Sequence, residues 1–493
     1  MRIFRHNAVL AFLPLLGLVM LVAAGGTLLI SGGRYAEAPM QYASGGLTPE
    51  QYAQRQDDMN RRLAGELPAA ALGAAIRVPL SPAEIDAVDK APRWVSPMKV
   101  GIVKPLTPGV ELSGLTRGPG RGPTTGTEAA ATPTRDGGFV WAQVISSENA
   151  GGIRLHLENF SLPRNAELYF YSRSGQAFGP YTESGPHGNG DFWTTAVFAN
   201  EGILQVRLRP PVSDDDLRGV SLRISEAGMI TPRFVRDVQI SLDAPPPPGW
   251  PCGNPSCLVD ATCVSGTPAD PAKLAEAKME WIQGAFIYTC TGGLISDNNP
   301  NASNYFLTAN HCLSKNNNAQ NVTFYWRFAT SSCPATSCPS NGGWPYITSG
   351  STIAAAGRKG DFTLLHLNSN PPAGSVFLGW TNAPVANTNG AHLYRISNPN
   401  FGPQAYSQHD VDTATGTCSG WPRGERIYSH DVTGAIDGGS SGSSVLNASS
   451  QIVGQLSGLC GFNVNNPCDS AQNATVDGAF AFYYATVQPI LNP

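Results

Sequence analysis

Gly438-Gly439-Ser440-Ser441-Gly442-Ser443 is the stretch of this chain that decides its fold. It places two neighbouring serines in a glycine frame, and two unrelated folds present a nucleophilic serine in such a frame. If Ser440 is the nucleophile, the pattern is G-x-S-x-G, the strained turn from a strand into a helix. If Ser441 is the nucleophile, the pattern is G-x-S-G. The choice of serine is therefore also a choice of fold.

The order of polar residues along the chain excludes the first alternative. A G-x-S-x-G serine of an α/β-hydrolase is followed by its acid and then by its histidine. The last histidine of this chain is His430, which precedes both serines. In the fold that uses the G-x-S-G loop, histidine comes first, then aspartate, then serine. We therefore expect Ser441 to be the nucleophile, with both partners upstream.

The candidate base is His311. It lies in Thr308-Ala309-Asn310-His311-Cys312, after the apolar run Tyr305-Phe306-Leu307, which is typical of a buried strand that enters a turn. A serine hydroxyl is a weak nucleophile at neutral pH and needs a base within hydrogen-bond reach. Imidazole suits this role because its ordinary pKa is about 6.5. Most histidines are surface residues, but His311 alone has this setting.

The candidate acid is Asp361. It opens Asp361–Leu367, an alternating run of strand-forming residues. A carboxylate that orients the imidazole should be buried on a rigid element, and this position fits. The other carboxylates between the candidate base and the candidate nucleophile lie in polar, loop-like sequence, where a solvated side chain is the simpler interpretation. They are Asp410, Asp412, Glu425, Asp431 and Asp437.

Residues 305–312, 361–367 and 439–443 together resemble the trypsin-like serine endopeptidases of the chymotrypsin fold. The resemblance is closer to the secreted bacterial branch that includes the lysyl endopeptidases, and it covers about the last half of the chain. It implies an all-β fold with a double antiparallel β-barrel and the catalytic cleft between the barrels.

The same resemblance implies the roles of individual residues. His311 is then the general base, Asp361 its orienting acid and Ser441 the nucleophile. The backbone N–H groups of Gly439 and Ser441 would form the oxyanion hole, which needs donors where charge develops. Ser440 takes the place of the acid that pairs with a new N-terminus in animal trypsins, so that activation switch is not expected.

The resemblance also aligns the substrate pocket. Ala435 occupies the base of the P1 pocket, and Thr475 the position where lysyl endopeptidases carry a carboxylate. Asp477 could serve only if the register slips by two residues. Because a buried P1 lysine without a carboxylate costs several kcal/mol, lysine at P1 is a weakened prediction. Ser457 replaces the family's substrate-stacking histidine, and Ser457 and Gly458 could pair with an extended substrate.

A length of 493 residues predicts two or three domains. The expected parts are a signal peptide or signal anchor at 1–38, a pro-segment with one helix and loops at 39–135, a β-sandwich prodomain at 136–242, a Pro-rich linker at 243–251 and the protease domain at 252–493.

The N-terminus has the pattern of an export signal. Arg2 and Arg5 precede nearly unbroken apolar sequence from Ala8 to Ile30. At about 1.5 Å per helical residue this run could also span a bilayer, so an uncleaved anchor is the alternative. We expect a secreted or periplasmic protein, or a membrane-anchored one, with no other membrane partner.

The middle of the chain predicts one helix and a set of short strands. Thr48–Leu67 has helix formers and charges, and Gly114–Arg135 is loop-like. The strand-like runs are Phe139–Ile145, Gly152–Leu157, Ala166–Tyr171, Phe192–Phe198, Ile203–Arg209 and Ser221–Ile224, a spacing typical of a β-sandwich. This part resembles the propeptide of the same bacterial proteases, and a sugar-binding sandwich is the alternative. In the protease domain we expect one helical interruption, Lys273–Trp281.

Composition and cysteines set further limits. Charged residues are 14% of the chain and the net charge is −4, which argues against nucleic-acid binding. All ten cysteines follow position 251, which indicates disulfides in an oxidising compartment. Zinc-ligand clusters are absent from the sequence, so we expect no metal and no cofactor. The resemblance implies the pairs Cys290–Cys312 and Cys263–Cys333, and joins Cys257 to Cys460 or Cys468.

We therefore expect a secreted serine endopeptidase, made as a proenzyme, that acts on proteins or peptides through an acyl-enzyme. Its own prodomain is the other expected partner, as a folding aid or as a lid over the cleft. The alternative is a non-catalytic secreted binding or adhesion protein with a protease-like barrel. An intact set of His311, Asp361 and Ser441 disfavours that alternative.

Overall fold

The structure is a computed structural model that describes residues 35–72, 74–91, 97–118, 129–173, 175–235, 255–299, 302–335 and 345–493. Ala36–Pro493 is one structural unit. We call its described residues 36–235 the N-terminal region and 255–493 the C-terminal region. The expected export signal up to position 34 and the expected linker at 243–251 lie outside the described residues. Within the described part, none of the helices is long and apolar enough to cross a membrane.

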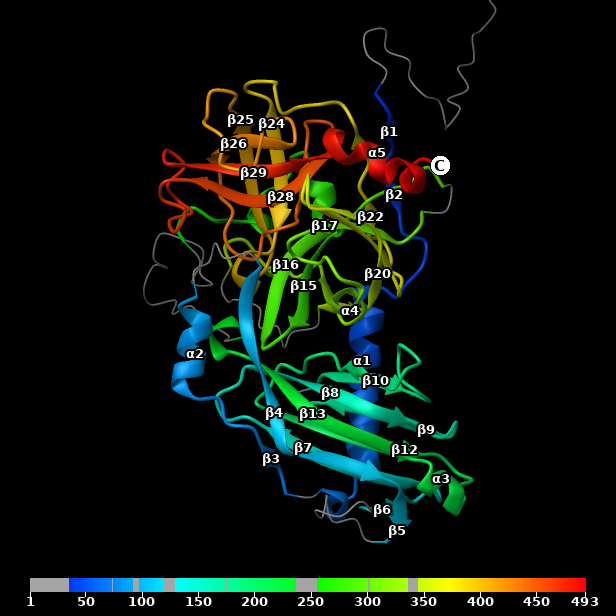
Figure 1. Ribbon diagram of the computed structural model, residues 1–493. Helices are drawn as coiled ribbons and strands as arrows, with labels where there is room; N and C mark the ends of the chain where they lie inside the picture. The colour runs from blue at the N-terminus through cyan, green and yellow to red at the C-terminus, as the bar shows by residue number, and fades with distance from the viewer. Residues whose placement is uncertain are drawn as a thin grey trace, which may run out of the picture. The chain divides into compact units, whose positions relative to one another are not determined.

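Six antiparallel strands form a closed barrel in the second half of the C-terminal region (Figure 1). They are β24 (His392–Ser397), β25 (Ala405–Val411), β26 (Arg426–Thr433), β27 (Ser444–Leu446), β28 (Ile452–Gly461) and β29 (Asn473–Ala479). The pairing runs β28-β27-β24-β25-β26-β29, and β29 pairs back onto β28. This return pairing removes both sheet edges.

The first half of the C-terminal region forms an open antiparallel barrel. Its strands are β15 (Glu276–Gln283), β16 (Phe286–Leu294), β17 (Tyr305–Ala309), β18 (Thr323–Trp326), β19 (Tyr346–Ser349), β20 (Ser351–Gly357) and β21 (Phe362–Leu367). They pair in the order β19-β18-β15-β16-β17-β21-β20. Short elements complete the region: β14 (Val259–Asp260), η3 (Ala261–Cys263), η4 (Asp270–Leu274), α4 (Asn316–Gln320), β22 (Val376–Phe377), β23 (Trp380–Thr381), η5 (Pro399–Phe401) and α5 (Phe480–Leu491).

The expected all-β class with two antiparallel barrels is confirmed, but one detail was wrong. The helix expected at Lys273–Trp281 is a short 3-10 turn, η4, followed by strand β15. The side chains of β15 are buried along most of its length, on both faces. A strand covered on both faces loses the alternation of polar and apolar residues, so the charged residues Lys278 and Glu280 gave no strand signal.

Two groups of strands make up the N-terminal region. One pairs in the order β10-β9-β12-β7-β6-β5, with β3 on β7, and the other in the order β11-β8-β13-β4. The strands are β3 (Ile76–Arg77), β4 (Met98–Ser113), β5 (Leu115–Arg117), β6 (Ala129–Pro133), β7 (Phe139–Ser146), β8 (Gly152–Ser161), β9 (Ala166–Tyr171), β10 (Ala177–Tyr181), β11 (Phe192–Trp193), β12 (Glu201–Leu208) and β13 (Ser221–Ile230). Both groups contribute to one hydrophobic cluster, so a β-sandwich remains our interpretation.

The helices of the N-terminal region are α1 (Pro49–Glu66), η1 (Ala69–Ala71), α2 (Pro82–Asp89), α3 (Asp214–Arg218) and η2 (Pro232–Phe234). Helix α1 matches the expected Thr48–Leu67: Thr48 caps it in a capping box with Gln51. The expectation of loops for the rest of 39–135 was wrong, because α2 and the long strand β4 lie there. The expected boundary at 38 also falls within folded chain, since β1 (Glu37–Ala38) pairs with β23.

The two regions share sheet and core. Strand β4 pairs with β16, so the second strand group continues into the open barrel (Figure 1). Strands β1 and β2 (Gln41–Tyr42) pair with β23 and β22. Arg154 on β8 forms an ion pair with Glu280 on β15 at 2.9 Å, and both side chains are buried. Because an unpaired buried charge is costly, this pair ties the two regions together.

Candidate active site

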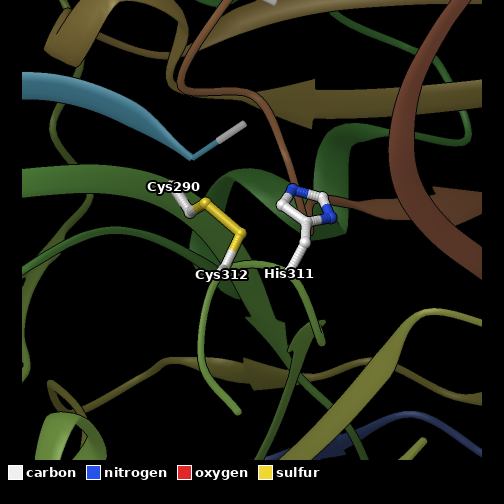
Figure 2. A group of neighbouring side chains, drawn as sticks. All are labelled: Cys290, His311 and Cys312. Atoms are coloured by element: carbon white, nitrogen blue, oxygen red, sulfur yellow. A yellow bond between two sulfur atoms is a disulfide. The ribbon is translucent and has the colours of Figure 1, made fainter. Parts of the chain in front are cut away.

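His311 lies in the turn after β17, beside a disulfide. Cys312, the next residue, is bonded to Cys290 on β16, which fixes the turn to the neighbouring strand. Figure 2 shows the ring next to this bond. The potential ligand atoms of Cys290, His311 and Cys312 lie within 4.8 Å of one another. Both sulfurs are used in the disulfide, so neither is the thiolate that a metal would need.

Asp361 is brought to His311 by strand pairing. Strand β21 begins at the next residue and pairs with β17, with Thr308 opposite Thr363. The Asp361 carboxylate accepts from His311 Nδ1 at 2.8 Å and from the His311 backbone N–H at 2.9 Å. Asp361 itself has a φ of 51°, a left-handed conformation that aspartate tolerates better than most residues. Asn310 N also donates a backbone hydrogen bond to Asp361 O at 3.0 Å, which holds the two segments together.

The carboxylate of Asp361 stays ionised despite its burial. Burial by itself raises the pKa of this carboxyl, but the charge of His311 and its two hydrogen bonds outweigh that effect, so the pKa lies below its ordinary value. An ionised carboxylate accepts the proton on Nδ1, which leaves Nε2 of His311 as the basic nitrogen. Within the described residues Nε2 has no hydrogen-bond partner.

Ser441 lies in a loop that is hydrogen-bonded to strand β16. Thr291 N donates to Ser441 O at 2.8 Å, and Thr291 Oγ1 donates to Gly439 O at 2.9 Å. Gly442 has a φ of 85°, and a Cβ there would lie 2.2 Å from Thr308 Oγ1. The loop therefore requires glycine at this position both for its backbone conformation and for space.

The Gly438–Gly439 peptide is oriented by a second loop. Asn400 N donates to Gly438 O at 2.6 Å. Because a trans peptide is planar, its N–H, that of Gly439, points to the opposite side from this carbonyl. Gly439 has a φ of 94°, and a Cβ there would lie 3.0 Å from Asn398 O. The predicted oxyanion donor thus has a fixed orientation.

Ser440, the other serine of the pair, is buried and directed to different partners. Its Oγ accepts from Ser397 Oγ at 3.0 Å. Its side chain is fully buried, whereas Ser441 lines a cavity. The two serines of residues 438–443 therefore have different environments, and Ser441 is the one that lines the cavity.

A cavity of about 1060 Å³ brings the predicted site residues together. Five of them line it: His311, Asp361, Ser441, Ser457 and Gly458. Trp421 and Arg426 also line it, and sequence reasoning did not single them out. Because His311 and Ser441 both line this cavity, a substrate in it would meet both residues.

The predicted substrate-pocket residues do not all reach this cavity. Ala435 is buried and packs with Leu258 and Ala405, outside the cavity lining. Thr475 is buried as well, and its hydroxyl donates to Asp431 Oδ1 at 3.0 Å. Ser457, aligned with a substrate-stacking histidine, instead lies beside the Asp361 carboxylate and lowers its pKa.

Asp477 is excluded as the carboxylate of the P1 pocket, the role that a two-residue slip in register would have given it. It lies opposite Ile427 and Leu456 in the sheet and forms a fully buried ion pair with Arg395. Burial raises its pKa, and the charge of Arg395 opposes that effect. A carboxylate that balances a buried arginine cannot also neutralise a substrate lysine.

The cysteines pair as the resemblance implied where the structure describes them. Cys290 is bonded to Cys312 and Cys263 to Cys333. The open choice for Cys257 resolves to Cys468, and Cys418 pairs with Cys460. Cys252 and Cys338 lie outside the described residues.

Comparison with known proteins places this geometry in a family. A family model for the lysyl endopeptidase C-terminal domain matches residues 254–472. The chain is also 30% identical over 383 residues to a lysyl endopeptidase of Pseudomonas aeruginosa, an alignment that covers 75% of each protein. The chain belongs to the lysyl endopeptidase family. It is a serine endopeptidase.

Solved structures resemble the chain more distantly. The Rv3671c protease from M. tuberculosis in its active form is 15% identical, with a TM-score of 0.32, over 47% of this chain and 87% of that chain. An inactivated protease paralogue of the scabies mite is 15% identical, with a TM-score of 0.32, over 46% and 98%.

One buried acid of this lysyl endopeptidase family member lies directly behind the nucleophile loop. Glu276, the first residue of β15, accepts from Ser444 N at 3.1 Å. Burial raises its pKa to about 8, although Ser444 and the charge of Arg395 act in the opposite direction. Burial therefore favours the neutral form of Glu276. The sequence offered no signal that Glu276 contacts the loop of Ser441, because this contact depends on the tertiary fold.

Replacing Glu276 with glutamine should remove a pH dependence of stability. The folded state keeps its proton up to about pH 8, whereas the unfolded carboxyl loses it near its ordinary value of 4.5. The free energy of unfolding of the parent should therefore fall between pH 4.5 and 8, by up to about 1.4 kcal/mol per pH unit. Urea unfolding of Ser441→Ala proteins with and without Glu276→Gln measures this. Parallel pH profiles would contradict the assignment.

Proposed function

We propose that this serine endopeptidase is exported as a proenzyme and that His311, Asp361 and Ser441 are its catalytic residues. One observation carries the proposal: the bonded pair His311–Asp361 lines the same cavity as Ser441. The cavity contains a base with a free nitrogen and a serine in a glycine loop, and these are the parts that acyl transfer needs.

The chemistry follows from this arrangement. His311 Nε2 takes the proton of Ser441 Oγ as the oxygen attacks the substrate carbonyl. The N–H groups of Gly439 and Ser441 stabilise the oxyanion of the tetrahedral intermediate. His311 then gives its proton to the leaving amine, and water hydrolyses the acyl-enzyme by the same steps. Asp361 keeps the proton on Nδ1 and stabilises the imidazolium.

The proposal of a proenzyme rests on where β4 lies. It pairs with β16 through Met98 opposite Thr289 and Lys99 opposite Tyr288. Thr289 directly precedes Cys290, whose disulfide partner follows His311. An N-terminal strand thus occupies the sheet edge beside the catalytic histidine. An extended substrate that needs this edge for backbone pairing would compete with β4.

The proposal of export rests on two independent features. The apolar run Ala8–Ile30 after Arg2 and Arg5 is typical of an export signal. The C-terminal region contains at least four disulfides, which persist in oxidising compartments.

Protein or peptide substrates follow from the enzyme class, and lysine at P1 is the preference that the name of the Pseudomonas relative suggests. Thr475 holds the aligned pocket position, and its hydroxyl is bonded to Asp431. We propose Asp431 as the source of negative charge for a P1 lysine. His409 is buried beside it, with 2.7 Å between Nδ1 and Oδ1.

The two neighbouring serines provide a matched test of the nucleophile. The secreted protein should react with a fluorophosphonate probe, and Ser441→Ala should abolish labelling because the attacking oxygen is gone. Ser440→Ala removes a buried hydroxyl one residue away and should still label. Asp361→Asn should lower kcat on the order of 10⁴-fold, because the negative charge is lost and the amide N–H favours the wrong tautomer of His311. Labelling of Ser441→Ala at the parent level would refute the assignment.

Substitutions at Lys99 test whether β4 blocks the cleft. In a Ser441→Ala background the full chain should bind an extended peptide weakly, and Lys99→Pro should tighten binding at least about tenfold, because proline cannot donate to the strand ladder. Lys99→Ala keeps the backbone amide and should bind like the parent. Isothermal titration calorimetry measures the Kd values. Equal Kd values for all three chains would argue against a substrate-competing strand.

Peptides that differ only at P1 test the role of Asp431. Asp431→Asn should lower kcat/KM for a P1 lysine peptide by about tenfold, since one charge interaction is lost, and leave a P1 alanine peptide unchanged. Asp410→Asn, which removes a partly exposed carboxylate on the paired strand β25, is the control. A lysine preference that survives Asp431→Asn would show that another group recognises the substrate.

A further inference from the structure

The loop before β25 has a backbone conformation that needs external support. Asn400 and Phe401 are consecutive and have φ values of 55° and 60°. For Phe401 this left-handed conformation costs roughly 1–2 kcal/mol, whereas asparagine tolerates it better, so contacts outside the loop must hold Phe401 in it. The structure provides such contacts on two sides.

One side of the loop holds the oxyanion hole. Asn400 N donates to Gly438 O at 2.6 Å, and Asn400 Nδ2 donates to Asp437 Oδ2 at 2.9 Å. The first bond fixes the peptide whose N–H belongs to Gly439. If this peptide turned over, a carbonyl would replace the donor, and a site that loses one oxyanion donor loses about 10²–10³-fold in kcat.

The other side of the loop contacts the N-terminal region. Phe401 is completely buried in the cluster that forms the N-terminal core. Its ring lies 6.3 Å from the rings of Phe198 and Phe234, both of the N-terminal region. From the C-terminal region, Lys278 Nζ donates to Phe401 O at 3.0 Å and lies 3.7 Å from the centre of its ring.

We propose that the N-terminal region sets the oxyanion hole of the enzyme. Phe198 and Phe234 hold Phe401, the adjacent Asn400 is thereby fixed, and Asn400 orients the Gly438–Gly439 peptide. This inference rests on the proposed function, because it states what the propeptide does to the proposed catalytic site. Phe198 and Phe234 are positioning residues: they touch neither substrate nor reacting atoms.

The test uses the full chain with Phe198→Ala and Phe234→Ala together. We expect kcat of the uncleaved full chain, per folded molecule after gel filtration, to fall at least tenfold on a small ester that needs no pairing with the edge of β16. KM should stay within twofold because the substrate cavity is unchanged. The pH profile of kcat should keep its shape, since the His311–Asp361 pair is untouched.

Phe160→Ala is the matched control. Phe160 is a buried phenylalanine of the same core, and its ring packs against Phe192 at 5.2 Å. Its loss should lower the yield of secreted protein by destabilising the N-terminal region, without changing kcat per folded molecule. An equal loss of kcat in this control would overturn the inference, because general instability would then explain it.

Milder substitutions serve as the test if the double alanine variant is poorly secreted. Phe198→Leu with Phe234→Leu keeps an apolar contact and should lower kcat in the same direction by a smaller factor. Parent kcat in the variants would overturn the inference. If the parent itself fails to label at Ser441, the proposed function fails instead, so the two failures are distinguishable.

Discussion

The bonds of Thr291 to the nucleophile loop are the constraint on which the site depends. Its backbone N–H holds Ser441 O and its hydroxyl holds Gly439 O, while the same hydroxyl accepts from Asn398 N at 3.0 Å. Thr291 lies on β16, next to the cysteine bonded to the histidine turn. One strand therefore sets the positions of the serine loop, of the histidine and of the loop that orients the oxyanion peptide. Each of these would be free to shift if it were held only by its own local sequence.

The same strand connects the site to the N-terminal region. β16 pairs with β4 along its outer edge, and its neighbour β15 contributes Lys278 and Glu280 to the interface. Burial lowers the pKa of Lys278 well below its ordinary value, and the charge of Glu280 opposes that effect. Glu280 forms an ion pair with Arg154 and accepts a hydrogen bond from the Tyr325 hydroxyl at 2.5 Å. These side chains are shielded from water only while the two regions stay together, because residues of both regions cover them.

Expectations from sequence succeeded where the signal is local. The capped helix after Thr48 and strands such as Ala166–Tyr171 were found from patterns of a few residues. The long strand β4 was missed, because Pro105 and Pro108 interrupt its pattern and its partners β13 and β16 lie more than a hundred residues away. The false helix at Lys273–Trp281 has a different origin. Burial on both faces removes the alternation by which a strand is recognised.

The sequence by itself determined which residues are candidates for the chemistry of the site. The order of His311, Asp361 and Ser441 is a property of the chain, and it excludes a fold whose histidine must follow the serine. The glycine frame also determined which loop could bring backbone donors to the reacting atoms. These conclusions needed no distances, since they depend on residue type and order.

The tertiary structure decided how those residues are supported and what else lies in the pocket. The bond from Asn400 to Gly438, the bond from Ser444 to Glu276 and the ion pair of Asp477 with Arg395 join positions far apart in the chain. Their physical basis is burial: a polar group inside the fold must find its partner among whichever residues the sheets bring together. No local pattern encodes that choice, and so the candidate nucleophile could be predicted from sequence, whereas the groups that position it could not.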